Sequence, residues 1–265
     1  MSVYINDDPV FFQEALDSIL NQSLVPSEIV LVKNGPLSFE LDNVITKYIA
    51  DFNVFKIVTI DENVGLTKAL NVGLKECKYD LIARMDSDDI SLYERFELQI
   101  SYLIDNPDIT CVSAPVIEFD PNNLLVDYIR HLPEKHDEIS NFSAWRSPMN
   151  HPCTTFRKSH ILSVGAYPII SENSGGLEDW ALWCKLITKG YKLSNMNKPL
   201  LRMRAGNDLY LRRGTAFFNH ELSILWYLFS IKHISLLKLF INILMRLPLR
   251  LSPVFVRRFI YLNFR

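Results

Sequence analysis

Short apolar runs alternate with helical patterns through the first 105 residues. Runs typical of buried strands cover 3–5, 28–33, 54–60 and 79–85, and apolar residues at helical spacing cover 9–21, 39–50, 66–77 and 92–105. Asp8 followed by Pro9 is a typical helix start. Because strands that alternate with helices favour crossover connections, this half of the chain predicts a parallel sheet.

After residue 105 the order of elements changes. Strands are predicted over 109–119, 151–157 and 192–203, and helices over 134–145, just before Gly165 and over 178–189, with Gly190 in the C′ position. We therefore predict an α/β fold: one Rossmann-like domain over 1–206 with a mixed, mostly parallel central sheet, and a helical basic extension over 207–265.

The extension has a helical pattern of its own. Between residues 234 and 246 the polar residues step by three and four, which gives a narrow polar stripe on an apolar helix, made of Ser235, Lys238, Asn242 and Arg246. We expect Pro248 and Pro253 to break the chain. The best apolar run of the extension, 222–231, stops at Lys232, short of the roughly 18 residues that a membrane-spanning helix needs.

Charge is unevenly distributed along the chain. The formal net charge is -2, yet residues 209–265 hold nine Lys and Arg against the single acid Glu221. A basic amphipathic segment is typical of proteins that meet an anionic membrane surface, and a helix packed on the body is the alternative. Nucleic acid fits poorly, because the arginines alternate with large aliphatic residues and the body is acidic.

The composition, with 48% apolar and 22% charged residues, indicates a globular protein. The four cysteines have no C-x-x-C spacing and are expected to be reduced thiols: Cys77, Cys111, Cys153 and Cys184. Together with the lack of a signal-peptide pattern, they favour a cytoplasmic setting.

Three carboxylates follow the apolar run 79–85 directly, in the sequence Asp86-Ser87-Asp88-Asp89. Carboxylates this close repel one another unless a cation compensates, so the cluster predicts a site for a hard divalent ion. In an open α/β sheet it would also lie in the crevice beyond the carboxyl ends of the strands, where ligands bind.

Other interpretations of this cluster are open. A solvated helix start needs no metal. A calcium EF-hand fails because Ile90 replaces an oxygen ligand and Ser91 replaces the turn glycine. A phosphatase with an aspartyl nucleophile also places D-x-D at a strand end, but Ile90 is the wrong following residue and no strong Lys motif follows.

A second group of residues opens a helix behind two glycines, in the run Gly175-Gly176-Leu177-Glu178-Asp179-Trp180. A carboxylate on a rigid helix end can act as a general base toward a hydroxyl nucleophile. A helix start with favourable acids is the plain alternative. Trp180 and Trp183 are expected to be partly core, and one of them to offer a flat platform to a sugar ring.

In this order the residues resemble the family 2 inverting glycosyltransferases of the A-type fold, most of all bacterial enzymes that build O-antigen, capsule or amylovoran-like exopolysaccharide. The resemblance spans roughly 1–206. It rests on Ser2-Val3-Tyr4, on 28–32, on Asn63-Val64-Gly65-Leu66 followed by Ala69-Leu70-Asn71, on the acidic cluster and on Glu178-Asp179.

The resemblance implies a UDP-sugar donor and a Mn²⁺ or Mg²⁺ ion on its diphosphate. By that resemblance Asp88 is the metal ligand, Asp86 lies near the ribose and the metal, and Asp89 is a supporting ligand. Asp179, with Glu178 beside it, matches the base that deprotonates the acceptor hydroxyl. The hydroxyl then attacks the face opposite the nucleotide, which inverts the configuration.

The resemblance also implies roles for residues outside the two acidic groups. Tyr4, Asn34, Asn63 and Gly65 are assigned to the nucleotide, Arg212 and Arg213 to a loop over the donor diphosphate, and His151 and Trp180 to the acceptor side. The family usually has an acid in the turn where Lys33 and Asn34 stand, and Asn34 is expected to bond a pyrimidine edge instead. The chain starts inside the first strand, so we expect a short first strand or a start further upstream.

These assignments predict a hexosyltransferase on the inner face of the plasma membrane, peripheral and acting on a polyprenyl-diphosphate-linked saccharide. A nucleotidyl- or phosphoryl-transfer enzyme is one alternative. A non-catalytic, membrane-associated subunit that binds sugar nucleotides is another. The sequence leaves the donor sugar, the linkage and the oligomeric state open.

Overall fold

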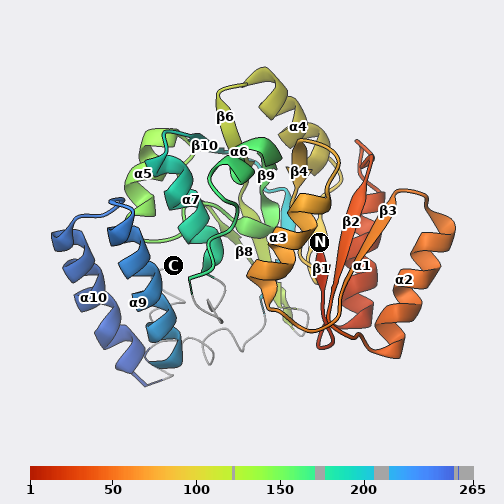
Figure 1. The fold of residues 1–265 in the computed structure, drawn as a ribbon, viewed down its shortest axis with the longest axis horizontal. Helices are drawn as coiled ribbons and strands as arrows, with labels where there is room; N and C mark the ends of the chain where they lie inside the picture. The colour runs from red at the N-terminus through yellow and green to blue at the C-terminus, as the bar shows by residue number, and fades with distance from the viewer. Residues whose placement is uncertain (121–122, 171–176, 206–214, 254–255, 257–265) are drawn as a thin grey trace.

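The computed structural model describes residues 1–120, 123–170, 177–205, 215–253 and 256. Its N-terminal part is a parallel three-stranded sheet in the order β1 (Ser2–Val3), β2 (Ile29–Asn34), β3 (Phe55–Ile60). The crossover helices are α1 (Pro9–Leu20), α2 (Phe39–Asp51) and α3 (Leu66–Glu76). The predicted strand and helix alternation of this part is therefore confirmed (Figure 1).

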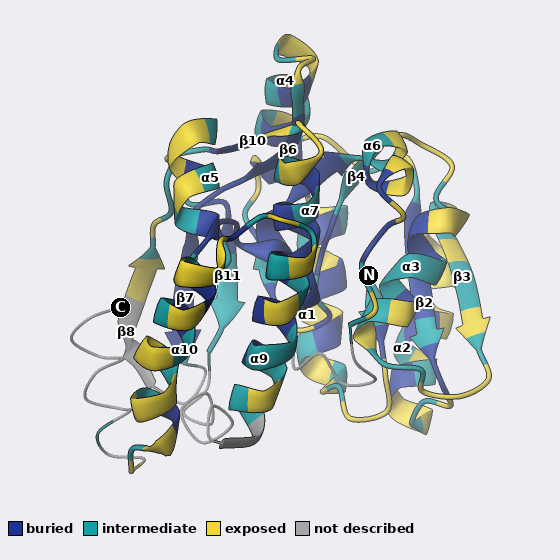
Figure 2. Ribbon diagram, turned by 60° about the vertical axis from the view of Figure 1, so that its left-hand side comes forward, coloured by how far each residue is buried: buried dark blue, intermediate teal, exposed yellow. Residues whose placement is uncertain are grey.

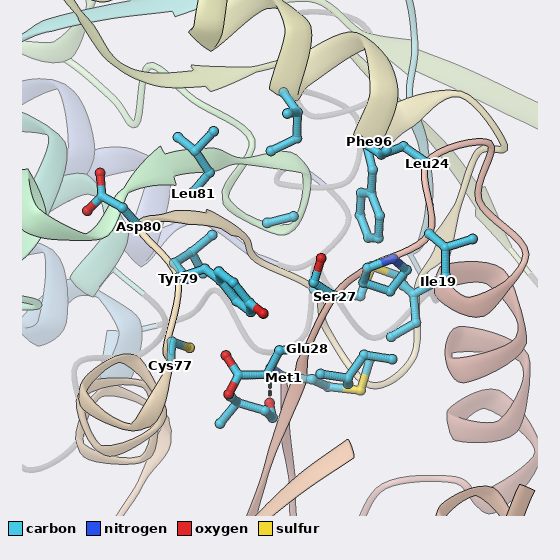
Figure 3. A pocket seen from close by; sticks show the side chains of 18 residues that line it. Met1, Ile19, Leu24, Ser27, Glu28, Cys77, Tyr79, Asp80, Leu81 and Phe96 are labelled. Atoms are coloured by element: carbon cyan, nitrogen blue, oxygen red, sulfur yellow. Dashed lines mark hydrogen bonds between the residues drawn. The ribbon is translucent and has the colours of Figure 1, made fainter. Parts of the chain in front are cut away.

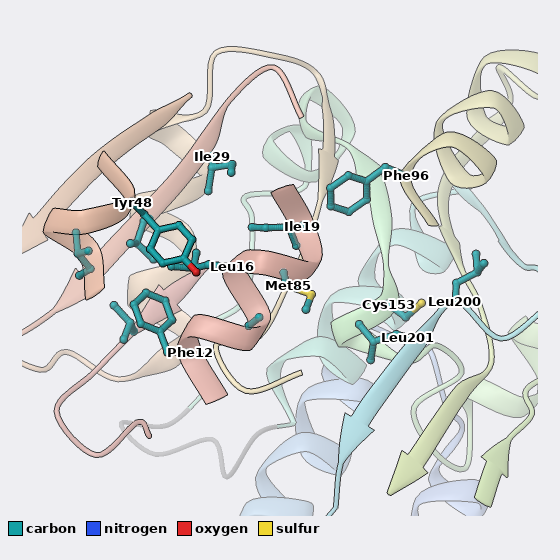
Figure 4. Close-up of a cluster of buried hydrophobic side chains, with 14 of the residues drawn as sticks. Phe12, Leu16, Ile19, Ile29, Tyr48, Met85, Phe96, Cys153, Leu200 and Leu201 are labelled. Atoms are coloured by element: carbon teal, nitrogen blue, oxygen red, sulfur yellow. The ribbon is translucent and has the colours of Figure 1, made fainter. Parts of the chain in front are cut away.

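The two faces of β2 are covered by different helices, as its period-2 side chains require. Ile29 and Leu31 belong to the buried cluster that also contains residues of α1 and α2 (Figure 4). Val32 points the other way, toward Gly73 of α3, where a Cβ would lie 2.8 Å from the Val32 Cγ2 atom. The helix can therefore approach the strand closely only because residue 73 is glycine.

The start of α1 follows the predicted capping pattern. The Asp8 carboxylate accepts hydrogen bonds from the backbone N–H groups of Val10 at 2.8 Å and Phe11 at 3.2 Å, and Pro9 is the first helical residue. This cap leaves the neighbouring acid, Asp7, available for another role.

Two strands predicted as continuous are each divided in two. The run 109–119 forms β6 (Ile109–Ser113) and β7 (Val116–Asp120), and 192–203 forms β10 (Lys192–Asn195) and β11 (Leu201–Arg204). β10 pairs parallel to β6, and β11 parallel to β7, so both strands pass from one sheet into the next. Pro115 and Pro199 lie at the two interruptions, where a residue without an N–H ends the ladder.

The remaining strands complete two four-stranded mixed sheets. Their orders are β10-β6-β9-β4 and β5-β11-β7-β8, with β4 (Leu81–Ala83), β5 (Ile90–Ser91), β8 (Asn123–Arg130) and β9 (Thr155–Arg157). β5 and β8 were not predicted. The run 79–85 is a strand only over its middle, and 151–157 begins with a 3₁₀ turn, His151–Cys153.

Helices cover these sheets. They are α4 (Arg95–Asp105), α5 (His136–Ser143), α6 (Lys158–Ser163) and α7 (Glu178–Thr188). α7 is followed by Gly190 at φ 84°, the conformation that the predicted C′ position requires. Mixed α/β architecture, the predicted fold class, is thus confirmed.

The C-terminal part of the described chain is a helical hairpin of α9 (Thr215–Ser230) and α10 (Leu236–Leu251), with α10 outermost (Figure 1). The prediction that Pro248 breaks the chain was wrong, because α10 continues through it and the Ser252 N–H bonds the Pro248 carbonyl at 3.0 Å. Arg250 holds this last turn against α9 through two 2.7 Å hydrogen bonds to Glu221. None of the helices within the described residues is long and apolar enough to cross a membrane.

Candidate active site

The acidic cluster occupies the connection between β4 and β5. Asp86, Asp88 and Asp89 place one oxygen each within 4.8 Å of one another. Asp89 is buried and Asp88 is exposed. Since β4 ends at Ala83, the cluster lies beyond the carboxyl end of this strand, as predicted from the sequence.

Mutual repulsion and burial disturb the protonation of this cluster. Partial desolvation, with the charges of Asp86 and Asp7, raises the pKa of Asp88 to about 6. Burial together with Asp86 and Asp88 raises the pKa of Asp89 well above its ordinary value. Three carboxylate oxygens this close together are the donor set that a hard divalent cation would stabilise, so the residues fit Mn²⁺ or Mg²⁺.

A fourth carboxylate, Asp7, joins the cluster from the loop before α1. Its Oδ2 atom accepts hydrogen bonds from the Ser87 hydroxyl at 2.9 Å and the Tyr4 N–H at 3.0 Å. Burial raises the pKa of this carboxyl. Sequence reasoning did not select Asp7, although the pair Asp7-Asp8 was a signal, since only one of the two can cap α1. Tyr4, assigned to the nucleotide, lies beside this acid and is 37% exposed.

Arg84 is the buried cation of the site. Its guanidinium bonds both carboxylate oxygens of Asp86. Its positive charge also lowers the pKa of Asp88, Asp89 and Asp179 against the effect of burial. The positive charge of Arg84 therefore acts on both the acidic cluster and the helix start that carries Asp179. No pattern in the sequence pointed to this role.

Arg204, at the end of β11, closes the other side of the cluster. Its backbone N–H donates to Asp89 at 3.0 Å and its Nε donates to the Asp88 carbonyl oxygen at 2.5 Å. The guanidinium lies 4.0 Å from the centre of the Phe11 ring and pairs with Glu14. Arg212 and Arg213, assigned to a loop over the donor diphosphate, lie outside the described residues.

The residues assigned to the nucleotide base meet in the turns after β2 and β3. The Asn34 side chain donates to Asn63 Oδ1 at 3.1 Å and accepts from the Val64 N–H at 3.0 Å. Gly65, at φ 81°, is the residue before α3. Asn34 therefore holds the loop 63–65 in place. The neighbouring Lys33 pairs with Asp42 at 2.6 Å.

Asp179 lies in the first turn of α7, beside Glu178, and both carboxylates are buried. Burial and the nearby charge of Glu178 raise the pKa of Asp179 to about 7. The Ser147 hydroxyl, which sequence reasoning missed, donates to Asp179 Oδ2 at 2.9 Å. A carboxyl with a pKa near neutrality can accept a proton from a hydroxyl group, as a general base must.

The aromatic residues of the acceptor side are more buried than predicted. The His151 Nε2 atom lies 2.9 Å from the Tyr167 hydroxyl, and burial lowers the pKa of this histidine well below its usual range. Trp180 is 2% exposed, and its indole N–H donates to the Ser143 carbonyl at 2.7 Å. Trp183 is fully buried. Both indoles are core residues, which corrects the prediction that one presents a flat face to a sugar.

A mostly apolar cavity of about 440 Å³ is separate from this site (Figure 3). It lies between β2 and β4, where β1 is only two residues long, and is lined by such residues as Ile29, Leu81 and Phe96. None of the acids of the site lines it. It therefore contributes nothing to the chemistry described above.

Comparison with known sequences decides what this arrangement is. The model of the family described as "Glycosyl transferase family 2" matches residues 3–164. This chain belongs to glycosyl transferase family 2. Amylovoran biosynthesis glycosyltransferase AmsE of Erwinia amylovora is 36% identical to it over 98% of this chain and 96% of that protein. The UDP-Gal:alpha-D-GlcNAc-diphosphoundecaprenol beta-1,3-galactosyltransferase of Escherichia coli is 35% identical over 98% and 93%.

Solved structures of similar shape support the fold. The mannosyltransferase PcManGT from Pyrobaculum calidifontis, in complex with GDP-Man and Mn²⁺, aligns with a TM-score of 0.65 at 17% identity and covers 92% of this chain and 67% of its own. S. aureus TarS with UDP-GlcNAc aligns with the same TM-score and identity, over 92% and 71%. The predicted glycosyl transferase family 2 membership and the predicted glycosyltransferase activity are both confirmed. The phosphoryl-transfer and non-catalytic alternatives are set aside.

Proposed function

We propose that this family 2 glycosyltransferase is metal-dependent and inverting, and transfers a hexose or N-acetylhexosamine from a UDP-sugar to a polyprenyl-diphosphate-linked saccharide in bacterial surface polysaccharide synthesis. The observation that carries the proposal is the pairing of the acidic cluster with the buried Asp179 around Arg84. The donor and acceptor classes are taken from the Escherichia coli relative, whose name states UDP-Gal and GlcNAc-diphosphoundecaprenol.

Asp88, with Asp86 and Asp89 beside it, would hold the metal ion. When bound, the ion neutralises charge that develops on the leaving nucleoside diphosphate. Arg84 fixes the carboxylate of Asp86 through two contacts and so keeps the donor oxygens together.

Asp179 accepts the proton of the acceptor hydroxyl. The hydrogen bond from Ser147 orients the carboxylate, and burial, together with the charge of Glu178, raises its pKa to about 7. Attack from the face opposite the leaving diphosphate inverts the anomeric configuration. His151, beside Tyr167, is proposed to line the acceptor side.

The remaining assignments complete the proposal. Tyr4, Asn34, Asn63 and Gly65 shape the nucleotide end, and Arg212 and Arg213 meet the donor diphosphate. Residues 1–206 form the catalytic domain and 207–265 an extension that keeps the enzyme, a cytoplasmic protein, on the inner face of the plasma membrane.

The test is a transfer assay with purified full-length protein, a panel of UDP-sugars and a lipid-diphosphate GlcNAc analogue. We expect one donor to give a product of inverted anomeric configuration, in a reaction that EDTA stops and Mn²⁺ or Mg²⁺ restores. Asp88→Asn should abolish metal-dependent UDP binding in calorimetry. Asp105→Asn, which removes an exposed carboxylate from α4, should bind UDP normally. EDTA-resistant transfer by the Asp88→Asn variant, or a product of retained configuration, contradicts the proposal.

A further inference from the structure

The side of α10 that packs on the protein carries polar residues beside the buried Leu239. Asn242 is fully buried, and its amide donates to the Ala144 carbonyl at 3.2 Å. Arg250 bonds Glu221 of α9 at 2.7 Å, and Arg246 lies 3.3 Å from the same carboxylate. The C-terminal part of the polar stripe therefore faces the body, and the charges of Arg246 and Arg250 are largely neutralised by one buried acid.

The opposite side of α10 is apolar and exposed (Figure 2). We call this side the apolar stripe, and it consists of Leu236, Leu237, Phe240, Leu244, Leu247 and Leu251, which are 65%, 68%, 58%, 53%, 37% and 64% exposed. At 100° per residue all six fall on one half of the helix surface. A water-exposed helix face made only of large apolar residues indicates a surface that is covered in use.

The charge around the apolar stripe favours a lipid bilayer as its cover. Over residues 215–253 the sequence has four basic residues and only one acid, Glu221, and that acid is buried against the two arginines. Lys232, in the turn before α10, is exposed, and Lys238 is half-buried in its first turn. An apolar face without exposed acids and with lysines at its end is the composition of helices that lie in the interface of an anionic membrane.

The buried side of α10 leads to the catalytic base. Asn242 and Arg246 bond the carbonyls of Ala144 and Trp145, and two residues further along the chain Ser147 bonds Asp179. The guanidinium of Arg246 also lies 5.4 Å from the centre of the Trp180 ring. Any contact that fixes the position of α10 therefore also fixes the segment 144–147, which orients Asp179.

We propose that the apolar stripe is the membrane-contact surface of this enzyme, which inserts into the headgroup region of an anionic bilayer and sets the Asp179 side of the site toward it. The arginines of α10 act inside the protein, so binding depends on apolar insertion more than on their charge. This inference rests on the proposed function, whose membrane contact it assigns to one face of α10, and vesicle binding tests that contact apart from the chemistry at Asp179.

Sedimentation with phosphatidylglycerol-containing vesicles tests this surface. The variant Phe240→Ser with Leu244→Ser removes two exposed side chains, and each contributes roughly a tenfold factor when it leaves water. We expect the partition coefficient of the double variant to fall about 100-fold. The matched control, Phe39→Ser with Ile104→Ser, removes side chains that are 76% and 64% exposed on α2 and α4 and should bind as the wild type does.

Two further measurements separate the possible outcomes. Transfer to a water-soluble acceptor analogue should be unchanged in the α10 variant, while transfer to the vesicle-embedded acceptor falls with binding. Vesicle binding by the variant at the wild-type level overturns the proposal. A wild-type protein that is a dimer in light scattering, with a variant that is a monomer, also overturns it, because the apolar stripe would then be a contact between two copies of the chain. If the wild-type protein binds vesicles but transfers no sugar to either acceptor, the proposed function is refuted and the lipid contact is not.

Discussion

At the scale of single residues, Asp179 is a carboxyl that the fold buries beside a second acid, Glu178. Its pKa is raised to about 7, so ionisation of this buried carboxyl lowers the free energy of unfolding. The stability that the carboxyl contributes is present at low pH and is lost as the pH rises through about 7. Such a cost is common where a catalytic group must stay ready to accept a proton.

Replacement of this carboxyl should therefore stabilise the protein. We expect Asp179→Asn to raise the midpoint of thermal unfolding, with a gain in the free energy of unfolding that is about 1 kcal/mol larger at about pH 8 than at about pH 6. Denaturant unfolding at the two pH values measures this difference. A gain independent of pH would mean that Asp179 has an ordinary pKa.

The sequence revealed the site residues that are neighbours along the chain, and missed those brought together by folding. Asp86, Asp88 and Asp89 stand out as a run. Ser87 meets Asp7 across 80 positions, and Ser147 meets Asp179 across 32. The two serines have no pattern around them, and the pair Asp7-Asp8 does not show where the acid that leaves α1 uncapped will lie, so the folded chain was needed to select these partners.

At the scale of elements, the turn after β2 is fixed by one glycine. Gly35 has a φ of +87°, and a Cβ there would lie 2.7 Å from the Asn63 backbone nitrogen. The loop that Asn34 holds could not keep its position beside a larger residue. Gly190 has a similar φ of +84°, but a Cβ at that residue would meet no atom within 4 Å.

These two glycines form a matched pair of substitutions. Gly190→Ala should lower the free energy of unfolding by about 1 kcal/mol, which is the penalty of a left-handed conformation alone. Gly35→Ala should cost about 3 kcal/mol because a backbone contact must also give way. It should weaken UDP binding as well, which Gly190→Ala should leave unchanged. Urea unfolding and calorimetry measure both effects, and equal losses in the two variants would contradict this account of the turn.

Elements were predicted well where periodicity was long and poorly where a proline fell inside a pattern. The run 109–119 contains Pro115 and yet reads as one apolar strand, because each half alone has a strand composition. At Pro248 the error was the opposite one, because a break was predicted where the helix continues. The bonds of Arg250 to Glu221 hold a turn that the proline alone would weaken. Pro115 thus interrupts the strand locally, whereas at Pro248 a partner distant in sequence decided the outcome.

At the scale of the whole molecule, the sequence defined two faces of α10 but could not say which one meets the body. The usual rule places the apolar face inside. Here Leu239 packs into the core, and Glu221 and the carbonyls of Ala144 and Trp145 supply partners for the polar residues beside it. The enzyme consequently presents an exposed apolar surface on the outer side of α10.

The central claim is that Asp179 is the base in glycosyl transfer and that it has no part in donor binding, which takes place at the acidic cluster. The most direct measurement is kcat of Asp179→Asn at saturating UDP-sugar, acceptor and Mn²⁺, with UDP affinity measured in parallel. Loss of a general base predicts a fall of at least about 100-fold in kcat, with UDP affinity unchanged and a fold more stable than the wild type. A kcat equal to that of the wild type would contradict the account.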